Sequence, residues 1–203
     1  MKGRVFRLGV TGGIGSGKSS VCRVFEVVGI PVFSADEEAK NIMDSNEAVI
    51  NGINSIAGKE MYPEGILDRR KMASLIFNDR EMLSKVNALV HPLVFGNFVD
   101  WADRQNAHYV IMEAAILFES GGSRLVDRIA TIVAPLDERI ERVMKSNMLT
   151  RNQVLERVRN QIDDDYRIKH SDYVIRNAES DMIIPEILRI HRDILGYIEH
   201  NRG

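Results

Sequence analysis

The glycine-rich segment from residue 12 to residue 19, GGIGSGKS, constrains the fold of this chain more than any other feature. It fits the pattern G-x-x-x-x-G-K-[ST], a P-loop whose backbone cradles phosphate groups. Val5 to Val10 before it is mostly apolar, as in a buried parallel strand. Residues 20–28 after it have apolar side chains at helical spacing, and Gly29 ends that run. The sequence therefore predicts a loop between a strand and a helix N-terminus, where N–H groups and the helix dipole favour an anion.

The residue types of this loop point to ATP and Mg²⁺ as ligands. Glycines let the backbone curl around a phosphate without a Cβ in the way. Lys18 can reach the β- and γ-phosphates, and the Ser19 hydroxyl can ligate Mg²⁺. A glycine-rich turn without a ligand is the alternative, but the motif, the strand and the helix agree. The candidate cofactor-binding residues here are Gly13, Ile14, Gly15, Ser16, Gly17, Lys18, Ser19 and Ser20.

Composition limits the classes of partner. The chain has 203 residues and a net charge of −2, so no basic excess argues for nucleic acid or an anionic membrane. Its single cysteine, Cys22, excludes an internal disulfide and suits a reducing cytoplasm. No apolar stretch reaches the roughly 18–20 residues of a membrane span. The N-terminus lacks the apolar segment of a secretory signal. We expect a cytoplasmic protein without nucleic-acid or membrane partners.

The order of strands and helices predicts an α/β fold with a five-stranded parallel sheet covered by helices. A long helical run between the second and third strands is where a second substrate would be held. It contains helices at 36–44, 47–57, 69–77 (capped by Asp68), 79–90 and 92–105, with Pro92 starting or kinking the last. The strands are expected at 5–10, 31–34, 108–113, 128–133 and 173–175. Later helices are expected at 137–144, from the capping box at Thr150 to Gln161, and at 181–200, with a break at 145–149.

Several acidic residues and one histidine are candidates for chemistry. Asp36 follows the second strand, so its carboxylate can accept the proton of an attacking hydroxyl, or it can only cap its helix. Glu113 ends the third strand and Glu119 follows it, as Mg²⁺-contacting acids or as solvated rim residues. His91 precedes Pro92 and, from the residues alone, is best explained as a helix-terminal residue.

A basic cluster surrounds the predicted break in the later helices. Arginines can stabilise a moving phosphoryl group, and the break would make this segment a mobile lid. The alternative is a solvated helix face with Glu138, Glu141 and Glu156 as partners. The cluster consists of Arg139, Arg142, Lys145, Arg151, Arg157 and Arg159.

These motifs together resemble the dephospho-coenzyme A kinase family. The resemblance runs in order from about Leu8 to Asn177, and the HP and ILFE motifs are its most specific parts. The matching segments are 12–19, Ser34-Ala35-Asp36, Leu67-Asp68-Arg69, His91-Pro92-Leu93-Val94, Ala115 to Glu119, and Arg157 to Gln161.

The resemblance implies ATP-dependent phosphorylation of the ribose 3′-hydroxyl of dephospho-CoA, giving coenzyme A and ADP, the last step of coenzyme A biosynthesis. It also implies a P-loop kinase core at 1–36, 106–137 and 166–203. A helical substrate region at 37–105 and a lid at 138–165 complete the implied organisation. The implied assembly is a monomer or a small homo-oligomer.

The resemblance assigns roles to individual residues. Asp36 becomes the catalytic base and Asn177 a neighbour of the adenine, beside Lys18 and Ser19, which the P-loop motif itself makes a catalytic residue and the metal ligand. Substrate contacts fall on Asp36, Arg69, His91, Leu117 and Glu119.

The chain departs from the family pattern at two positions. Ser34 stands where the family usually has an acid, and Ser146 where it usually has a lid arginine. Arg142 lies one helical turn before Ser146, so we expect it to act as the catalytic arginine instead.

Three other functions are compatible with parts of the sequence. Another small-molecule P-loop kinase, for a nucleoside monophosphate or a sugar, fits the helical insertion but not the HP and ILFE motifs. A GTPase switch should have an N-K-x-D signature, which the sequence lacks; the D-x-x-G at Asp193–Gly196 lies far past the core. An ATP-binding pseudokinase is suggested by Ser34 and Ser146.

Overall fold

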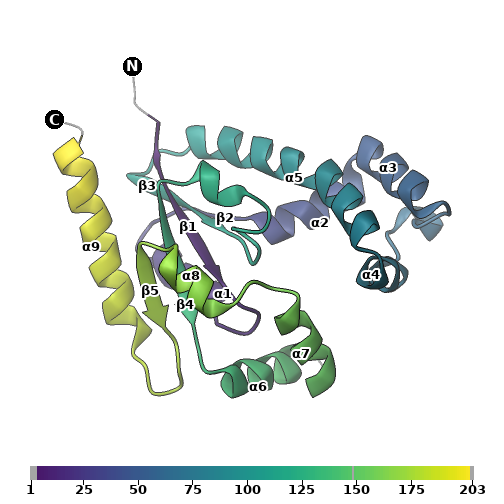
Figure 1. Ribbon diagram of the computed structural model, residues 1–203. Coiled ribbons are helices and arrows are strands. Elements are labelled where there is room, and N and C mark those ends of the chain that lie inside the picture. The colour runs from purple at the N-terminus through teal and green to yellow at the C-terminus, as the bar shows by residue number, and fades with distance from the viewer. Residues whose placement is uncertain (1–3, 148, 202–203) are drawn as a thin grey trace. The chain divides into compact units, whose positions relative to one another are not determined.

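The computed structural model describes residues 4–147 and 149–201, and its contacts divide the chain into two compact units (Figure 1). The first, here called the sheet unit, comprises Met1–Ser34 and Trp101–Gly203. The second, the helical unit, comprises Ala35–Asp100. The chain therefore leaves the sheet unit once and returns to it once.

The sheet unit is built on a five-stranded parallel sheet with the order β2-β3-β1-β4-β5. The central strand β1 pairs with β3 on one side and β4 on the other, so that Leu8 lies between Ile111 and Arg128. This confirms the predicted fold class. The strands are β1 (Phe6–Gly12), β2 (Val32–Ser34), β3 (Tyr109–Glu113), β4 (Arg128–Val133) and β5 (Tyr173–Arg176).

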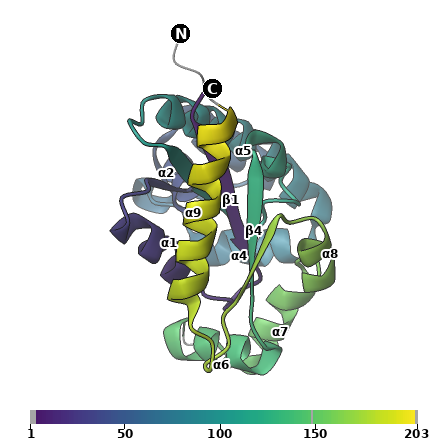
Figure 2. The ribbon, with the colours of Figure 1, turned by 90° about the vertical axis from the view of Figure 1, so that its left-hand side faces the viewer.

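One face of the sheet is covered by α1 (Lys18–Val27) and α9 (Ile183–Asn201). Figure 2 shows α9 in front of β1, with α1 beside α9. Four isoleucines of α9 recur every three or four residues and are fully or almost fully buried, as in an amphipathic helix on a core. Burying each such side chain contributes roughly 1.5–3 kcal/mol. The four isoleucines of this face are Ile187, Ile190, Ile194 and Ile198.

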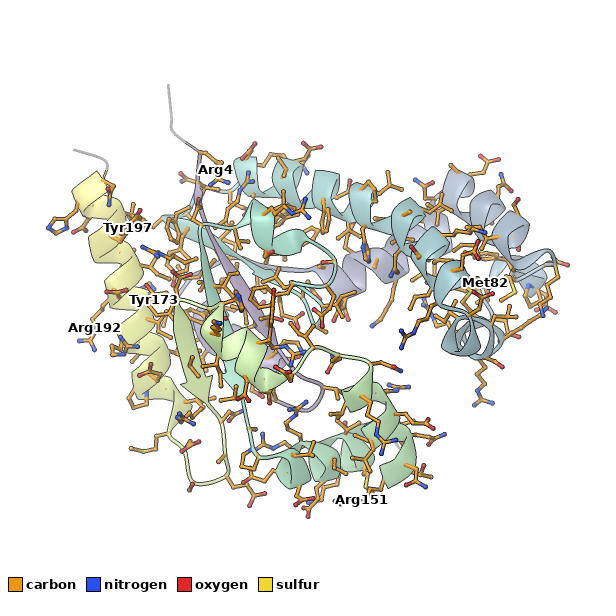
Figure 3. All side chains as sticks on the ribbon, in the orientation of Figure 1. Arg4, Met82, Arg151, Tyr173, Arg192 and Tyr197 are labelled. Carbon is orange, nitrogen blue, oxygen red and sulfur yellow. The ribbon has the colours of Figure 1, made fainter. Side chains whose placement is uncertain are left out.

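Further contacts in the sheet unit fix its edge and its opposite face. The Tyr173 hydroxyl of β5 donates to Asp193 of α9. Figure 3 labels Tyr173 on β5 and Arg192 on the neighbouring α9. On the opposite face the side chain of Leu117 is fully buried, 2.7 Å from where a Cβ on Gly9 would lie. That glycine of β1 therefore makes room for the turn after β3.

The segment after β4 forms α6 (Leu136–Asn147), α7 (Arg151–Arg159) and α8 (Asp164–Lys169). The capping box of Thr150 and Gln153 is present, as predicted. The predicted end of the first of these helices at Met144 is wrong, because α6 continues to Asn147. Ile140 and Val143 of α6 pack on Val154 of α7. Met148, part of the predicted break, lies outside the described residues. The short α8 and the 3₁₀ turn η2 (Gly122–Leu125) were not expected.

The helical unit contains α2 (Ala35–Ser45), α3 (Glu47–Ala57), the 3₁₀ turn η1 (Pro63–Gly65), α4 (Arg69–Asn78) and most of α5 (Arg80–Asp103). Asp68 caps α4 as predicted, its carboxylate accepting from the Lys71 N–H at 2.9 Å. The prediction of two helices separated near Pro92 is wrong: α5 is continuous, with Pro92 inside it. Within the described ranges no helix is long and apolar enough to cross a membrane.

Candidate nucleotide-phosphate site

The P-loop lies at the topological switch point of the sheet. It follows the carboxyl end of β1, whose neighbours β3 and β4 continue the sheet in opposite directions. Ligands of open α/β sheets bind at this position. Because α1 begins at Lys18, the loop also ends at a helix N-terminus.

Two glycines give the loop its curvature. Gly15 and Gly17 have φ angles of 76° and 93°, in the left-handed region that side chains disfavour. A Cβ on Gly15 would also lie 2.4 Å from the carbonyl oxygen of Arg139. Both positions therefore require glycine, as the motif predicts.

Three side chains from beyond β4 hold the loop from outside. Asn177 donates from Nδ2 to the Ser16 carbonyl at 2.8 Å, and Gln161 accepts the Ile14 N–H at 2.8 Å. Arg139 donates from Nε to the Ile14 carbonyl at 2.9 Å. Asn177 was expected beside the adenine, and it lies against the P-loop backbone. The contacts of Gln161 and Arg139 with this loop were not foreseen.

Polar side chains suited to phosphate and Mg²⁺ lie at the start of α1. Lys18 donates from Nζ to the Gly12 carbonyl at 3.1 Å, so its ammonium folds back over the loop. Ser19 and Ser20 are exposed. Among the residues that the structure describes, no group of three or more His, Cys, Asp or Glu could hold a metal ion. A hydroxyl ligand fits Mg²⁺ in this setting, because Mg²⁺ keeps several waters and is held mainly by substrate phosphates.

Glu113 ends β3 at the same sheet edge as the P-loop, and its carboxylate is almost buried at 9% exposure. The Ser34 hydroxyl donates to its Oε2 at 3.1 Å, because the two residues are register partners in β2 and β3. Burial, followed by the negative charges of Glu113 and Glu26, raises the pKa of the Cys22 thiol well above its usual range. The thiol therefore stays protonated, and Cys22 packs as an apolar residue of the core.

Leu117 and Glu119 lie in the turn after β3, and both contact other parts of the protein. Leu117 is fully buried, so its side chain is not exposed for a substrate contact. Glu119 accepts the Ile162 N–H at 3.1 Å and lies 3.7 Å from Nη2 of Arg167. The sequence reasoning weighed Glu119 as a rim acid or a ligand, and missed its place between α8 and this turn.

Arg142 of α6 reaches the loop that follows β5. Its Nη2 donates to Glu138 Oε2 and to the Asn177 carbonyl, both at 2.9 Å. The Glu138 partner is one that the solvated-face alternative named. The Arg142 guanidinium therefore holds Asn177, whose side chain holds the Ser16 carbonyl of the P-loop.

In the helical unit, Asp36 is the second residue of α2 and is partly buried. It lies inside the first turn, so it is not the residue that precedes and caps the helix. Three contacts hold α2 in place: Arg69 to Asp44 at 2.6 Å, the Tyr62 hydroxyl to the Met43 carbonyl at 2.8 Å, and Asn97 to Glu38 at 2.6 Å. Arg69, expected at the substrate, thus also fixes the helix that carries Asp36.

His91 lies within α5, one residue before Pro92, and not at a helix end. Its ring is partly buried, with its centroid 5.9 Å from that of Phe95. Burial lowers the pKa of His91, which favours the neutral imidazole at pH 7. A neutral ring can both donate and accept one hydrogen bond.

Comparison with known proteins decides the family. A family model described as Dephospho-CoA kinase matches residues 6–182. The chain belongs to the dephospho-CoA kinase family. A dephospho-CoA kinase of Bacteroides fragilis strain YCH46 is 35% identical over 185 residues, which cover 91% of this chain and 90% of the relative. The resemblance found in the sequence motifs is thereby confirmed.

Solved structures agree with this family. The crystal structure of TT1252 from Thermus thermophilus has a TM-score of 0.82 and 32% identity, covering 96% of this chain and 98% of that one. The dephospho-CoA kinase from Campylobacter jejuni has a TM-score of 0.68 at 23% identity, covering 94% and 97%. At that identity the second likeness shows the shared fold alone. For a dephospho-CoA kinase family member, ATP is the implied co-substrate of the P-loop.

Proposed function

We propose that this chain transfers the γ-phosphoryl group of ATP to the ribose 3′-hydroxyl of dephospho-CoA, giving coenzyme A and ADP. Membership of the dephospho-CoA kinase family is the observation that carries the proposal. The P-loop at the switch point of the sheet supports it, because that position suits the phosphates of a nucleotide.

The P-loop residues would bind and orient ATP. Backbone N–H groups at the start of α1 would cradle the phosphates, and Lys18 would exchange its contact with Gly12 for one with the β- and γ-phosphates. Bound Mg²⁺ supplies charge neutralisation between these phosphates, and Ser19 is the residue proposed to ligate it. Phosphoryl transfer needs mainly positioning and charge stabilisation, which these groups provide.

Asp36 is proposed as the base. Its carboxylate would orient the 3′-hydroxyl and take its proton as the new O–P bond forms and the bond to ADP breaks. The position of Asp36 within the first turn of α2, behind three contacts that hold this helix, supports a fixed orientation. His91 and Arg69 remain proposed substrate contacts of the same helical unit.

Of the two acids at and after the end of β3, we propose Glu113 as the contact to Mg²⁺-bound water. It lies at the P-loop edge of the sheet in register with Val10. Glu119 is engaged with the Ile162 N–H and lies near Arg167, which supports a structural role. Residues 138–165 remain the proposed lid, and a cytoplasmic location remains an expectation supported by the single, buried thiol of Cys22.

A coupled assay of ADP release with dephospho-CoA, AMP, adenosine and a sugar as acceptors tests the proposal. We expect turnover with dephospho-CoA and little with the others, because the helical unit would also hold the pantetheine arm. Comparable turnover of AMP or the sugar would reassign the chain to another class of small-molecule kinase. ATP binding without turnover of any acceptor would identify a pseudokinase.

A further inference from the structure

A chain of charged side chains lies behind the P-loop and was not foreseen from the sequence. It comprises Arg139 of α6, Asp164 and Arg167 of α8, and Glu119, and is here called the Arg139 network. The two arginines are only 5% and 1% exposed. Buried charges of this kind are tolerated when they are paired, and removing one partner leaves the other charge uncompensated.

Arg139 is the member that contacts the P-loop. Its Nε donates to the Ile14 carbonyl at 2.9 Å, and its Nη1 donates to Asp164 Oδ2 at 2.8 Å. Its third nitrogen, Nη2, lies 2.1 Å from where a Cβ on Gly13 would be. Gly13 does not have a left-handed backbone. The glycine at this position of the motif therefore makes room for a guanidinium.

The rest of the network fixes the orientation of Arg139. Asp164 accepts from Arg167 Nη1 at 2.9 Å through its other oxygen, so one carboxylate joins both arginines. Arg167 lies 3.7 Å from Glu119, which also accepts the Ile162 N–H. Burial, opposed by Asp164, lowers the pKa of Arg139, and the charge of Arg167 lowers it further. The negative charge of Asp164 thus offsets the repulsion between the guanidinium groups of Arg139 and Arg167.

The backbone of Ile14 is consequently held at both of its polar groups. Its carbonyl accepts from Arg139, and its N–H donates to Gln161, next to Ile162 in the chain. A P-loop binds phosphate through N–H groups that converge on the ligand, which requires its carbonyls to turn outward and find other donors. Arg139 is such a donor, and its planar guanidinium is fixed in orientation because Nε donates to Ile14 and Nη1 to Asp164.

We propose that Arg139 is a positioning residue that holds the P-loop in its phosphate-binding conformation, with Asp164 and Arg167 keeping its guanidinium in place. The inference rests on the proposed function only in taking ATP as the phosphate donor. It joins α6, most of which lies inside the proposed lid, and the start of α8 to the backbone that binds phosphate. A purely stabilising ion pair is the competing explanation.

The test is Arg139→Gln, with the dissociation constant of Mg-ADP measured by calorimetry beside KM for ATP and kcat. We expect the dissociation constant and the KM for ATP to rise about 10- to 100-fold, as for a lost charge-assisted hydrogen bond. Arg139→Lys keeps the positive charge but loses the planar set of guanidinium donors, so its dissociation constant and KM should lie between those of wild type and Arg139→Gln. Arg189→Gln, which breaks an exposed pair with Glu186 on α9, is the matched control and should leave both constants unchanged.

Gly13→Ala perturbs the same contact from the loop side and covers the case in which Arg139→Gln fails to fold. The added methyl group meets Nη2 of Arg139, so it should weaken Mg-ADP binding in the wild-type background and much less beside Arg139→Gln. A lower Tm for Arg139→Gln, with ADP affinity and KM within twofold of wild type, would overturn the proposal. So would strictly additive effects of Gly13→Ala and Arg139→Gln.

ADP binding also separates this inference from the proposed function. If wild type failed to phosphorylate dephospho-CoA while Arg139→Gln weakened Mg-ADP binding, the substrate assignment would fall and the role of Arg139 would stand. If wild type turned over dephospho-CoA and Arg139→Gln bound Mg-ADP normally, the substrate assignment would stand and the role of Arg139 would fall.

Discussion

Asp36 can be tested independently of the helix in which it lies. An acid in the first turn stabilises a helix by about 0.3–1 kcal/mol, so Asp36→Asn should change the free energy of unfolding by no more than that. A lost base should lower kcat by about 10²–10⁴-fold, with little change in either KM. Steady-state kinetics and thermal denaturation on the same preparation give both quantities. A variant with altered Tm and unaltered kcat would reduce Asp36 to a helix-stabilising residue.

Arg142 was expected from the sequence to replace a missing lid arginine, and its contacts suggest a different prediction. Because it holds the Asn177 carbonyl, and Asn177 holds Ser16, Arg142→Ala should loosen the loop after β5 and raise the KM for ATP. We expect a rise of roughly tenfold, the value of one charge-assisted hydrogen bond.

Single-turnover rates of Arg142→Ala and Ser146→Arg distinguish the two roles of Arg142. A large fall in the chemical rate for Arg142→Ala, at saturating ATP, would restore the expected transition-state role. A strong activation by Ser146→Arg, beside a nearly silent Arg142→Ala, would instead indicate a kinase weakened by its missing lid arginine.

At the scale of elements, two helix glycines of the helical unit form a matched pair. A Cβ on Gly96 of α5 meets nothing within 4 Å, whereas one on Gly52 of α3 lies 2.7 Å from Cδ1 of Leu89 on α5. Gly96→Ala should raise stability by about 0.5–1 kcal/mol through helix propensity. Gly52→Ala should lose that gain to overpacking, which costs about 1–3 kcal/mol. Denaturant unfolding of both variants checks the difference, and equal stabilisation would contradict it by showing that the Leu89 side chain makes room for the methyl group.

The elements also show where sequence reasoning stops. Local signals predicted α3 and β4 with their observed bounds, since Gly58 ends the first and an apolar run defines the second. Pro92 suggested a helix boundary, because an interior proline costs a helix one hydrogen bond. In α5 the helix nevertheless continues through Pro92, with Val90 and Val94 buried on either side of it. The six-residue α8 was missed because its periodicity is too short to detect.

The site, too, could be predicted where its residues are contiguous in sequence and not where the fold brings distant residues together. The P-loop is contiguous, so its spacing alone indicated the phosphate site. Arg139, Asp164 and Glu119 meet only through the fold, and α6 has charges on several faces. Burial of Arg139 could not be read from that pattern, which looked like a solvated helix. Ser34 was noted as a departure, but its Glu113 partner follows from the β2–β3 register.

For the whole molecule, nucleotide binding should be visible as stability. A ligand that binds only the folded state adds about 2.7 kcal/mol at a concentration of 100 times its dissociation constant. For a chain of this size that corresponds to a rise in Tm of roughly 5–10 °C with Mg-ADP. Removing Mg²⁺ with EDTA should abolish most of the rise, because Ser19 is proposed to act through the metal. An unchanged shift in EDTA would argue against that ligand.

The placement of β1 at the centre of the sheet has a consequence for synthesis on the ribosome. Phe6 pairs with Tyr109 and Leu8 with Arg128, so the first strand made must wait for about a hundred residues before either neighbour exists. At roughly 5–20 residues per second that interval lasts about 5–20 s. The helical unit, Ala35–Asp100, is completed within it and is one contiguous segment. The apolar first strand is therefore a predicted contact for ribosome-associated chaperones, which should release it only once β3 and β4 have emerged.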